Sequence, residues 1–354
     1  MARPLVGEEE AAAVARVLAS GWVMQGPEVA AFEREFAALV GAPFACAVSS
    51  GTAALHLALL AAGVRAGDEV ITVSHSFIAT ANSVRHCGAT PLFVDIEPAT
   101  YNIDAARIEA AISSRTRAIL CVHQMGMPCD LAAIGAIARR RGLPLVEDAA
   151  CAAGSEIQWN GEWQRIGRPH GDVACFSFHP RKLITTGEGG MVTTGDADID
   201  ARVRAWRAHE TRDGVFGFNY RMTDLQAAIG RVQLGRLGGL VAERRRLVAE
   251  LRERLAGVVI PVEPSWARSN WQSLCARFES AAAATAARAR LELAGIASRP
   301  GIANAHEDPS QANGLRSPLP ESERAQRECV LLPLPSQMSA SEVDRLVAAL
   351  AQRG

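Results

Sequence analysis

Phe176-Ser177-Phe178-His179-Pro180-Arg181-Lys182, followed closely by Thr185-Thr186-Gly187-Glu188-Gly189-Gly190, leads from an apolar, strand-like run into a polar turn rich in glycine. Lys182 is the single lysine among the 37 Lys and Arg residues of the chain. Arginine can supply plain positive charge, but only an amine that loses its proton can attack a carbonyl. The one lysine that remains is therefore a candidate for Schiff-base chemistry. The alternative, a leftover surface lysine, is disfavoured by the flanking sequence.

Upstream of this stretch, short apolar runs alternate with amphipathic segments. Seven runs are expected to form strands: Phe44–Val48, Glu69–Val73, Thr90–Val94, Ala118–Val122, Leu143–Val146, Val173–Phe178 and Met191–Thr194. Four intervening segments are expected to form helices: Ala53–Ala62, the run after Phe77, Ile108–Ile112 and Leu131–Arg141. This alternation predicts an α/β fold with a mainly parallel, seven-stranded sheet between helices. Because most of the strands are continuously apolar, we expect both faces of the sheet to be buried.

Downstream, the pattern changes near Thr223 to a long helical segment, Leu225–Leu255, with apolar residues at helical spacing. The tail then mixes further runs. Strands are expected at Val258–Val262 and Cys275–Phe278, helices at Ala281–Leu293 and Ser341–Ala351, and a loop at Gly301–Leu319. We therefore predict a large domain over residues 1–240 and a smaller α+β domain over residues 241–354.

Composition limits the partners of the chain. The formal net charge of −1 gives no electrostatic signature of nucleic-acid binding. The sequence shows no run long and apolar enough to cross a membrane and no signal-peptide pattern, so we expect a cytoplasmic protein. Its eight cysteines are scattered without metal-ligand spacing, which favours reduced thiols and predicts no metal site.

Two further motifs lie where strands are expected to end. Ser49-Ser50-Gly51-Thr52 joins the first strand to its helix, and small residues at a helix N-terminus suit a phosphate. The alternative there is an ordinary helix cap. Glu147-Asp148 follows the strand Leu143–Val146, at the edge where open α/β sheets bind ligands. A carboxylate there could pair with a protonated ring nitrogen, or it could merely cap a helix.

Phe77, after Ser74-His75-Ser76, stands just beyond another strand. An aromatic side chain at that edge could stack on a planar cofactor, although a core phenylalanine is the commoner outcome. Taken together, these motifs indicate a function more strongly than any one of them alone. A phosphate-binding turn, a stacking ring, a strand-end carboxylate and one lysine in a glycine-rich turn occur in the order expected for a pyridoxal phosphate enzyme of the aspartate aminotransferase fold, fold type I.

At this level of detail the chain resembles the DegT/StrS family of sugar aminotransferases, nearly from end to end. The matching blocks are Gly21-Trp22 with Gln25-Gly26-Pro27, Phe32-Glu33, Ser50 to Leu55, Phe77 to Asn82, Val94-Asp95, Val122-His123 with Gly126, Glu147 to Ala150, Phe176 to Gly190, Gly217 to Met222 and Leu331-Leu332-Pro333. The block from Ser177 to Lys182, with Thr186 to Gly190, is the most specific of them.

The resemblance implies a role for each motif. Lys182 would bind pyridoxal 5'-phosphate as an imine and move the proton, and Asp148 would pair with the pyridine nitrogen. Phe77 would stack on the ring, while Gly51, Thr52 and Ser177 would bind the phosphate. Asn219 would reach the phosphate of a neighbouring subunit, which implies a homodimer with shared sites. Cys151 stands where many members carry Gln or His in contact with the phenolic oxygen of the cofactor.

The resemblance also implies an activity: transfer of an amino group from an amino acid, with glutamate expected, to a nucleotide-linked keto sugar. Retained Lys182 argues against the dehydratase branch of the family, which has histidine there. Two alternatives stay open, namely another pyridoxal phosphate reaction such as retro-aldol cleavage or elimination, and a non-catalytic regulatory relative. Substrate choice is expected from Asn270-Trp271-Gln272-Ser273 and from Arg299-Pro300-Gly301 with His306. Trp271 could equally be a core aromatic, and His306 a plain surface residue.

Overall fold

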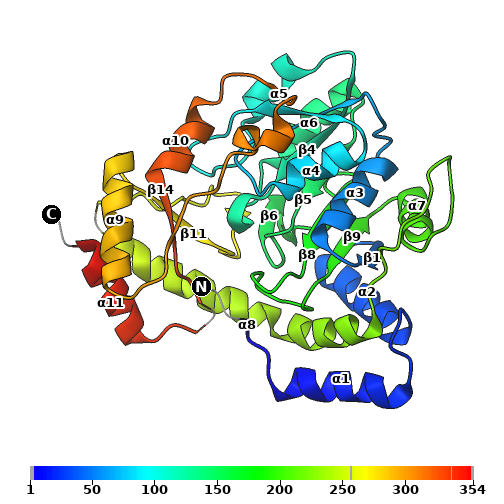
Figure 1. The fold of residues 1–354 in the computed structure, drawn as a ribbon, viewed down its shortest axis with the longest axis horizontal. Helices are drawn as coiled ribbons and strands as arrows, with labels where there is room; N and C mark the ends of the chain where they lie inside the picture. Colours follow the sequence, from blue (N-terminus) through cyan, green and yellow to red (C-terminus); the bar gives the residue numbers. More distant parts are fainter. Residues whose placement is uncertain (1–3, 256, 336, 352–354) are drawn as a thin grey trace.

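A sheet of eight strands organises the larger part of the computed structural model, which describes residues 4–255, 257–335 and 337–351 (Figure 1). In spatial order the strands are β1 (Phe44–Val48), β9 (Gly190–Thr194), β8 (Val173–Ser177), β5 (Leu145–Asp148), β4 (Thr116–Val122), β2 (Glu69–Val73), β3 (Thr90–Val94) and β13 (Leu315–Arg316). Only β9 runs antiparallel to its neighbours, so the prediction of a mainly parallel sheet is confirmed. The seven predicted strands are all present, and β13 adds an eighth from the segment predicted to be a loop.

Helices cover both faces of this sheet because successive strand residues point to opposite sides. In β2, Ile71 and Val73 belong to one apolar cluster, and Val70, which points the other way, belongs to the second. The first face is covered by α2 (Pro27–Val40), α5 (Ala105–Ala111), α6 (Leu131–Arg141) and the N-terminal half of α8 (Asp224–Arg254). The second is covered by α3 (Gly51–Ala61), α4 (Ala79–His86) and α7 (Ala197–Arg207). The sheet is thus buried on both faces, as expected.

The long helix α8 connects the two parts of the molecule (Figure 1). It begins at a capping box, in which Thr223 and Gln226 satisfy each other's backbone N–H groups. Its first half packs against α1 (Glu8–Ser20) and α2, and its last turns pack beside α11 (Ala340–Ala351). Because α8 continues unbroken past residue 240, the predicted division of the chain there stays a prediction.

The C-terminal region has its own core, formed by residues such as Leu247, Leu274, Leu291 and Leu346. Its elements are β11 (Leu274–Arg277), β14 (Cys329–Leu332), β12 (Arg299–Pro300), α9 (Ala281–Leu293), α10 (Pro320–Glu328) and α11. The prediction of a strand over Val258–Val262 is wrong, because only Val259 forms a single bridge, with Arg277. Pro261 has no N–H to donate to a ladder, which explains why that apolar run does not pair further.

A small sheet and three short turns complete the fold. The sheet consists of β10 (Ala267–Arg268), β6 (Glu156–Trp159) and β7 (Glu162–Arg165), and the 3₁₀ turns are η1 (Gln124–Gly126), η2 (Ala305–Glu307) and η3 (Pro309–Gln311). This sheet was not predicted from the sequence. Within the described ranges, none of the helices is both long and apolar enough to span a membrane.

Candidate functional site

The predicted phosphate-binding turn lies against the ends of β8 and β9. A Cβ atom on Gly51 would lie 2.7 Å from Cβ of Ser177, and one on Gly190 would collide with the carbonyl oxygen of Ser50. Both glycines are therefore required by close approach of the backbone. This packing brings Gly51, Thr52 and Ser177 to one small area, and the phosphate-binding role that the family resemblance implies for them stays a prediction.

This turn also begins α3, so the helix cap is confirmed, while phosphate binding stays a prediction. Ser50 is the helix cap, and its Oγ accepts a hydrogen bond of 3.1 Å from the N–H of Ala53. The N–H groups of Gly51 and Thr52 lie in the first turn, where an α-helix offers no internal acceptor. Exposed N–H groups at the positive end of a helix suit an anion, with the Ser177 hydroxyl beside them.

Asp148, at the end of β5, carries a buried carboxylate with only 5% of the residue exposed. Its Oδ2 accepts a hydrogen bond of 2.8 Å from the Thr80 hydroxyl, and its Oδ1 accepts one of 3.1 Å from the N–H of Ala150. No cationic side chain of the described residues forms an ion pair with it. A buried carboxylate without a positive partner is costly, so a ligand with a protonated ring nitrogen fits this position.

The adjacent acid, Glu147, is already fully engaged. Its carboxylate lies 3.0 Å from Nε2 of His123 and accepts a 2.8 Å hydrogen bond from the N–H of Gly171. His123 Nδ1 accepts a hydrogen bond from the N–H of Cys129, so its proton resides on Nε2 and points to Glu147. Of the two neighbouring acids, only Asp148 is free to meet a cation.

Lys182 lies close to the end of β5, where Asp148 is located. Its side chain is half-buried, and Nζ donates a hydrogen bond of 3.0 Å to Sγ of Cys151, three residues after Asp148. The main chain turns here, with the N–H of Lys182 bonded to the carbonyl of His179 at 2.8 Å. The structure thus brings Lys182 and Cys151 together, and the contact of both with one cofactor, which the family resemblance implies, stays a prediction.

A segment from the C-terminal region holds these two residues in place. Gln272 accepts a 2.8 Å hydrogen bond from the N–H of Leu183 and donates one of 2.7 Å to the carbonyl of Arg181, which brackets Lys182. Asn270 Nδ2 donates a hydrogen bond of 2.8 Å to the carbonyl of Cys151. The structure shows that Asn270 and Gln272 brace the site, and their expected part in substrate choice stays a prediction. The sequence held no local signal for this role.

Trp271, between them, is a core residue. It is 4% exposed and belongs to the apolar cluster of the C-terminal region, so the alternative of a core aromatic is the one that the structure supports. Arg244 of α8, itself buried, donates hydrogen bonds of 3.0 and 2.9 Å to the carbonyls of Trp271 and Gln272. The bracing segment is therefore anchored to the long helix.

Phe77 behaves differently from a core phenylalanine, because 72% of it is exposed. It precedes α4, and its carbonyl accepts a 3.0 Å hydrogen bond from the N–H of Thr80, the residue that contacts Asp148. An exposed ring can stack on a flat ligand, and this role of Phe77 stays a prediction. The contact of Thr80 with Asp148 was not predicted from the sequence, although Thr80 lies in the block from Phe77 to Asn82.

The segment around His306 lies against Ser74 and His75, which precede Phe77 in the chain. His306 Nδ1 lies 2.7 Å from the Ser74 hydroxyl, and Asn304 Oδ1 lies 3.1 Å from Nδ1 of His75, both at the end of β2. Burial lowers the pKa of His75 to about 4, so this ring is neutral and donates to Asn304. His306 is thus a structural contact of the site's rim and not a plain surface residue.

Asn219 is exposed in the segment between α7 and α8, and it forms a single antiparallel bridge with Ala208. Its neighbour Tyr220 accepts a 2.7 Å hydrogen bond from the N–H of Ser49, beside the phosphate-binding turn. In the described residues no hydrogen bond joins the Asn219 side chain to Lys182, Asp148 or Ser177. Its expected role at a neighbouring subunit is untested by this single chain.

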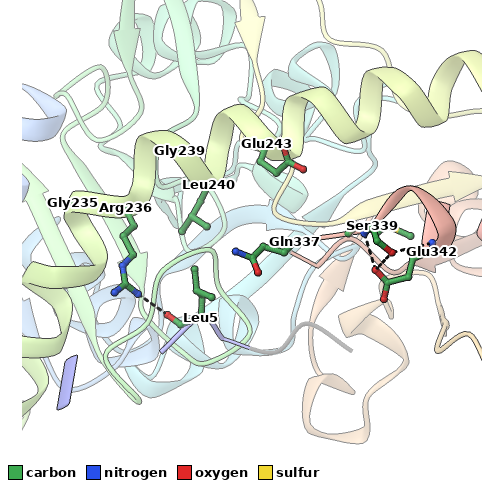
Figure 2. Close-up of a pocket in the computed structure, with 10 residues that line it drawn as sticks. Leu5, Gly235, Arg236, Gly239, Leu240, Glu243, Gln337, Ser339 and Glu342 are labelled. Atoms are coloured by element: carbon green, nitrogen blue, oxygen red, sulfur yellow. Dashed lines mark hydrogen bonds between the residues drawn. The ribbon is translucent and has the colours of Figure 1, made fainter. Parts of the chain in front are cut away.

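A separate cavity of about 820 Å³ lies between α8, the N-terminal segment and the start of α11 (Figure 2). Leu5, Gly239 and Glu342 are among its lining residues, and Arg236 donates a hydrogen bond to the carbonyl of Leu5 across it. None of the predicted site residues lines this cavity. The candidate site is the one around Lys182 and Asp148.

Known proteins resemble this chain over nearly its whole length. The sequence pattern of the DegT/DnrJ/EryC1/StrS aminotransferase family matches residues 4–351. The chain is 38% identical to GDP-perosamine synthase of Caulobacter vibrioides, over 99% of this chain and 97% of that protein. Its structure is similar to that of S. venezuelae DesV in complex with a ketimine intermediate (36% identity, TM-score 0.90, 97% and 93% covered). It is also similar to DesI in the presence of its TDP-sugar product (31%, TM-score 0.91, 98% and 91%).

Proposed function

Because the chain belongs to the DegT/DnrJ/EryC1/StrS aminotransferase family, we propose that it is a pyridoxal 5'-phosphate-dependent aminotransferase that aminates a nucleotide-linked keto sugar. The observation that carries the proposal is the buried, unpaired Asp148 at the same sheet edge as the chain's only lysine. The names of two relatives, GDP-perosamine synthase and DesI with its TDP-sugar product, support the acceptor class. The amino donor that we propose is glutamate.

Each residue of the site then has a defined task. The bound cofactor supplies an electron-withdrawing ring. Lys182 binds the cofactor through its amine and moves the proton, since no other lysine is available. Asp148 keeps the ring nitrogen protonated, held in orientation by Thr80. The turn at Gly51 and Thr52, with Ser177, binds the phosphate, and Phe77 covers the ring.

The purified enzyme tests this directly. Incubation with glutamate should convert the cofactor to pyridoxamine phosphate with release of 2-oxoglutarate, and a set of nucleotide-linked keto sugars should then identify the acceptor. Conversion with glutamate but release of a cleaved or eliminated product would favour a different pyridoxal phosphate reaction. No conversion with any amino acid would favour a non-catalytic relative.

The bracing role of Gln272 predicts a loss of rate without a matching loss of affinity. In Gln272→Ala, Leu183 loses a buried hydrogen-bond acceptor, which costs about 1–3 kcal/mol. We expect kcat to fall and KM for the donor to change little, because Gln272 holds the backbone around Lys182. Steady-state kinetics measure both. Gln272→Glu keeps the acceptor for Leu183 and should retain more of the rate, whereas equal losses in the two variants would contradict this role.

We also propose a homodimer whose sites are shared through Asn219. Phe216 in the same segment is 80% exposed, and Trp22 and Met24 are more than half exposed, which supports an apolar surface for a second copy. Mixing inactive Lys182→Ala and Asn219→Ala subunits should restore about a quarter of the wild-type activity, since half of the dimers would be mixed and carry one intact site. No restoration despite proven subunit exchange would contradict the shared site.

A cytoplasmic location completes the proposal. It is supported by eight cysteines that are all free in the structure, as expected in a reducing compartment.

A further inference from the structure

Lys182, the only lysine of the chain, contacts Cys151, the one cysteine that is not buried. Lys182 Nζ lies 3.0 Å from Cys151 Sγ. All eight cysteines lie in the described residues, and the other seven are buried. Solvent and small oxidants therefore reach Cys151 more readily than any other thiol of the chain. The proposed transamination uses Lys182 but requires no chemistry of this sulfur.

Both partners are held by the same short segment. Asn270 Nδ2 bonds the carbonyl of Cys151 at 2.8 Å, and Gln272 bonds the backbone on both sides of Lys182. The two anchors are themselves joined, because Asn270 Oδ1 accepts a 2.9 Å hydrogen bond from the N–H of Gln272. Groups that a rigid frame keeps in contact react far faster than the same groups free in solution.

We propose that Cys151 and Lys182 form a redox-sensitive modification site, in which a hydroperoxide links Sγ to Nζ through a sulfur–nitrogen bond. The sulfur attacks the peroxide, its O–O bond breaks, and Cys151 becomes a sulfenic acid while an alcohol or water leaves. The amine of Lys182 then attacks this sulfur, the S–O bond breaks, and water leaves with a proton from nitrogen. The sulfur is oxidised by two electrons, and the peroxide accepts them.

The link has a defined consequence for the enzyme. It occupies the amine that binds the cofactor, so the linked protein cannot hold pyridoxal 5'-phosphate covalently. It forms only while Lys182 is free, and a thiol reductant restores both side chains. This inference goes beyond the proposed function and depends on the amine and the thiol alone, whatever the acceptor substrate is.

Mass spectrometry tests the link without any substrate, so its failure is distinct from failure of the proposed function. Full-length enzyme is freed of cofactor with hydroxylamine, checked for folding by circular dichroism, and treated with hydrogen peroxide. We expect a protein lighter by two hydrogen atoms, a crosslink between the Cys151 and Lys182 peptides, and reversal by dithiothreitol. Holoenzyme whose Lys182 was first blocked by borohydride reduction should give no crosslink.

Substitutions test whether Cys151 and Lys182 are the two residues that form the crosslink. Cys151→Ser and Lys182→Arg should each abolish the crosslink, because one lacks the sulfur and the other the reactive amine. Cys87→Ser, which removes a buried thiol bonded to the carbonyl of His56, should form it as the wild type does. Oxidation of Cys151 to sulfinic or sulfonic acid beside an unmodified Lys182 would overturn the proposal. A crosslink from one of the buried cysteines would overturn it as well.

Discussion

Lys182→Arg is expected to abolish both covalent binding of the cofactor and transamination. Arginine keeps the positive charge but cannot lose its proton to form a bond with a carbonyl. The chain holds no second lysine that could replace it. Wild-type enzyme should be yellow, and borohydride should fix the cofactor to the peptide that contains Lys182. The variant should show neither the visible band nor the adduct, and its activity should fall to background.

A matched control tests whether borohydride labelling is specific to Lys182 or would occur at any lysine. Arg139→Lys places a second lysine at an exposed position near the end of α6. Borohydride should still label only Lys182 in that variant, because Arg139 is not among the residues gathered around Asp148. An adduct at another residue, or a Lys182→Arg enzyme that retains turnover, would contradict the assignment of Lys182.

Elements with a local signal could be predicted from the sequence. Each predicted strand of the large sheet is a short apolar run that ends at a turn, and all seven form. The apolar run Val258–Val262 misled the same reasoning, because Pro261 prevents continuous pairing. Strand β13 carries no apolar periodicity and becomes a strand only because Leu315 and Arg316 lie beside β3.

The residues of the candidate site also fall into those that a local signal identifies and those that depend on distant contacts. Lys182, Asp148 and Gly51 could be proposed because their residue types and their positions at strand ends suggest chemistry. The roles of Thr80 and Gln272 could not, since each depends on a hydrogen bond to a residue far away in the chain. The bonds of Gln272 to the backbone at Leu183 and Arg181 span 89 and 91 residues. Contacts at such separations depend on how α8 packs with the C-terminal region. The local residue pattern of the sequence does not reveal them.

The second large effect is expected at Asp148. Asp148→Asn should retain the cofactor, because Lys182 and the phosphate-binding turn are unchanged, but it should lose most of the reaction with glutamate. An amide carries no charge to keep the ring nitrogen protonated. The hydrogen-bond partners described for Asp148, the Thr80 hydroxyl and the Ala150 N–H, are not anions that could replace it. Breaking such a buried pair costs about 3–5 kcal/mol. Applied to the barrier, this slows the half-reaction by roughly 10²- to 10⁴-fold. Stopped-flow absorbance of the visible band measures the rate.

Two neighbouring substitutions make this prediction specific to one carboxylate. Thr80→Val removes the hydroxyl that donates to Oδ2 of Asp148 but leaves the charge, so its rate should fall far less. Glu147→Gln weakens the contacts of the adjacent acid with His123 and Gly171, and we expect it to lower thermal stability more than rate. A near-normal rate in Asp148→Asn, or a larger loss in Glu147→Gln, would mean that the ring nitrogen meets a different acid. The expected loss of rate decreases from Asp148→Asn to Thr80→Val to Glu147→Gln. Asp148 has no ion-pair partner among the described residues, Thr80 only orients its carboxylate, and Glu147 is already occupied by His123 and Gly171.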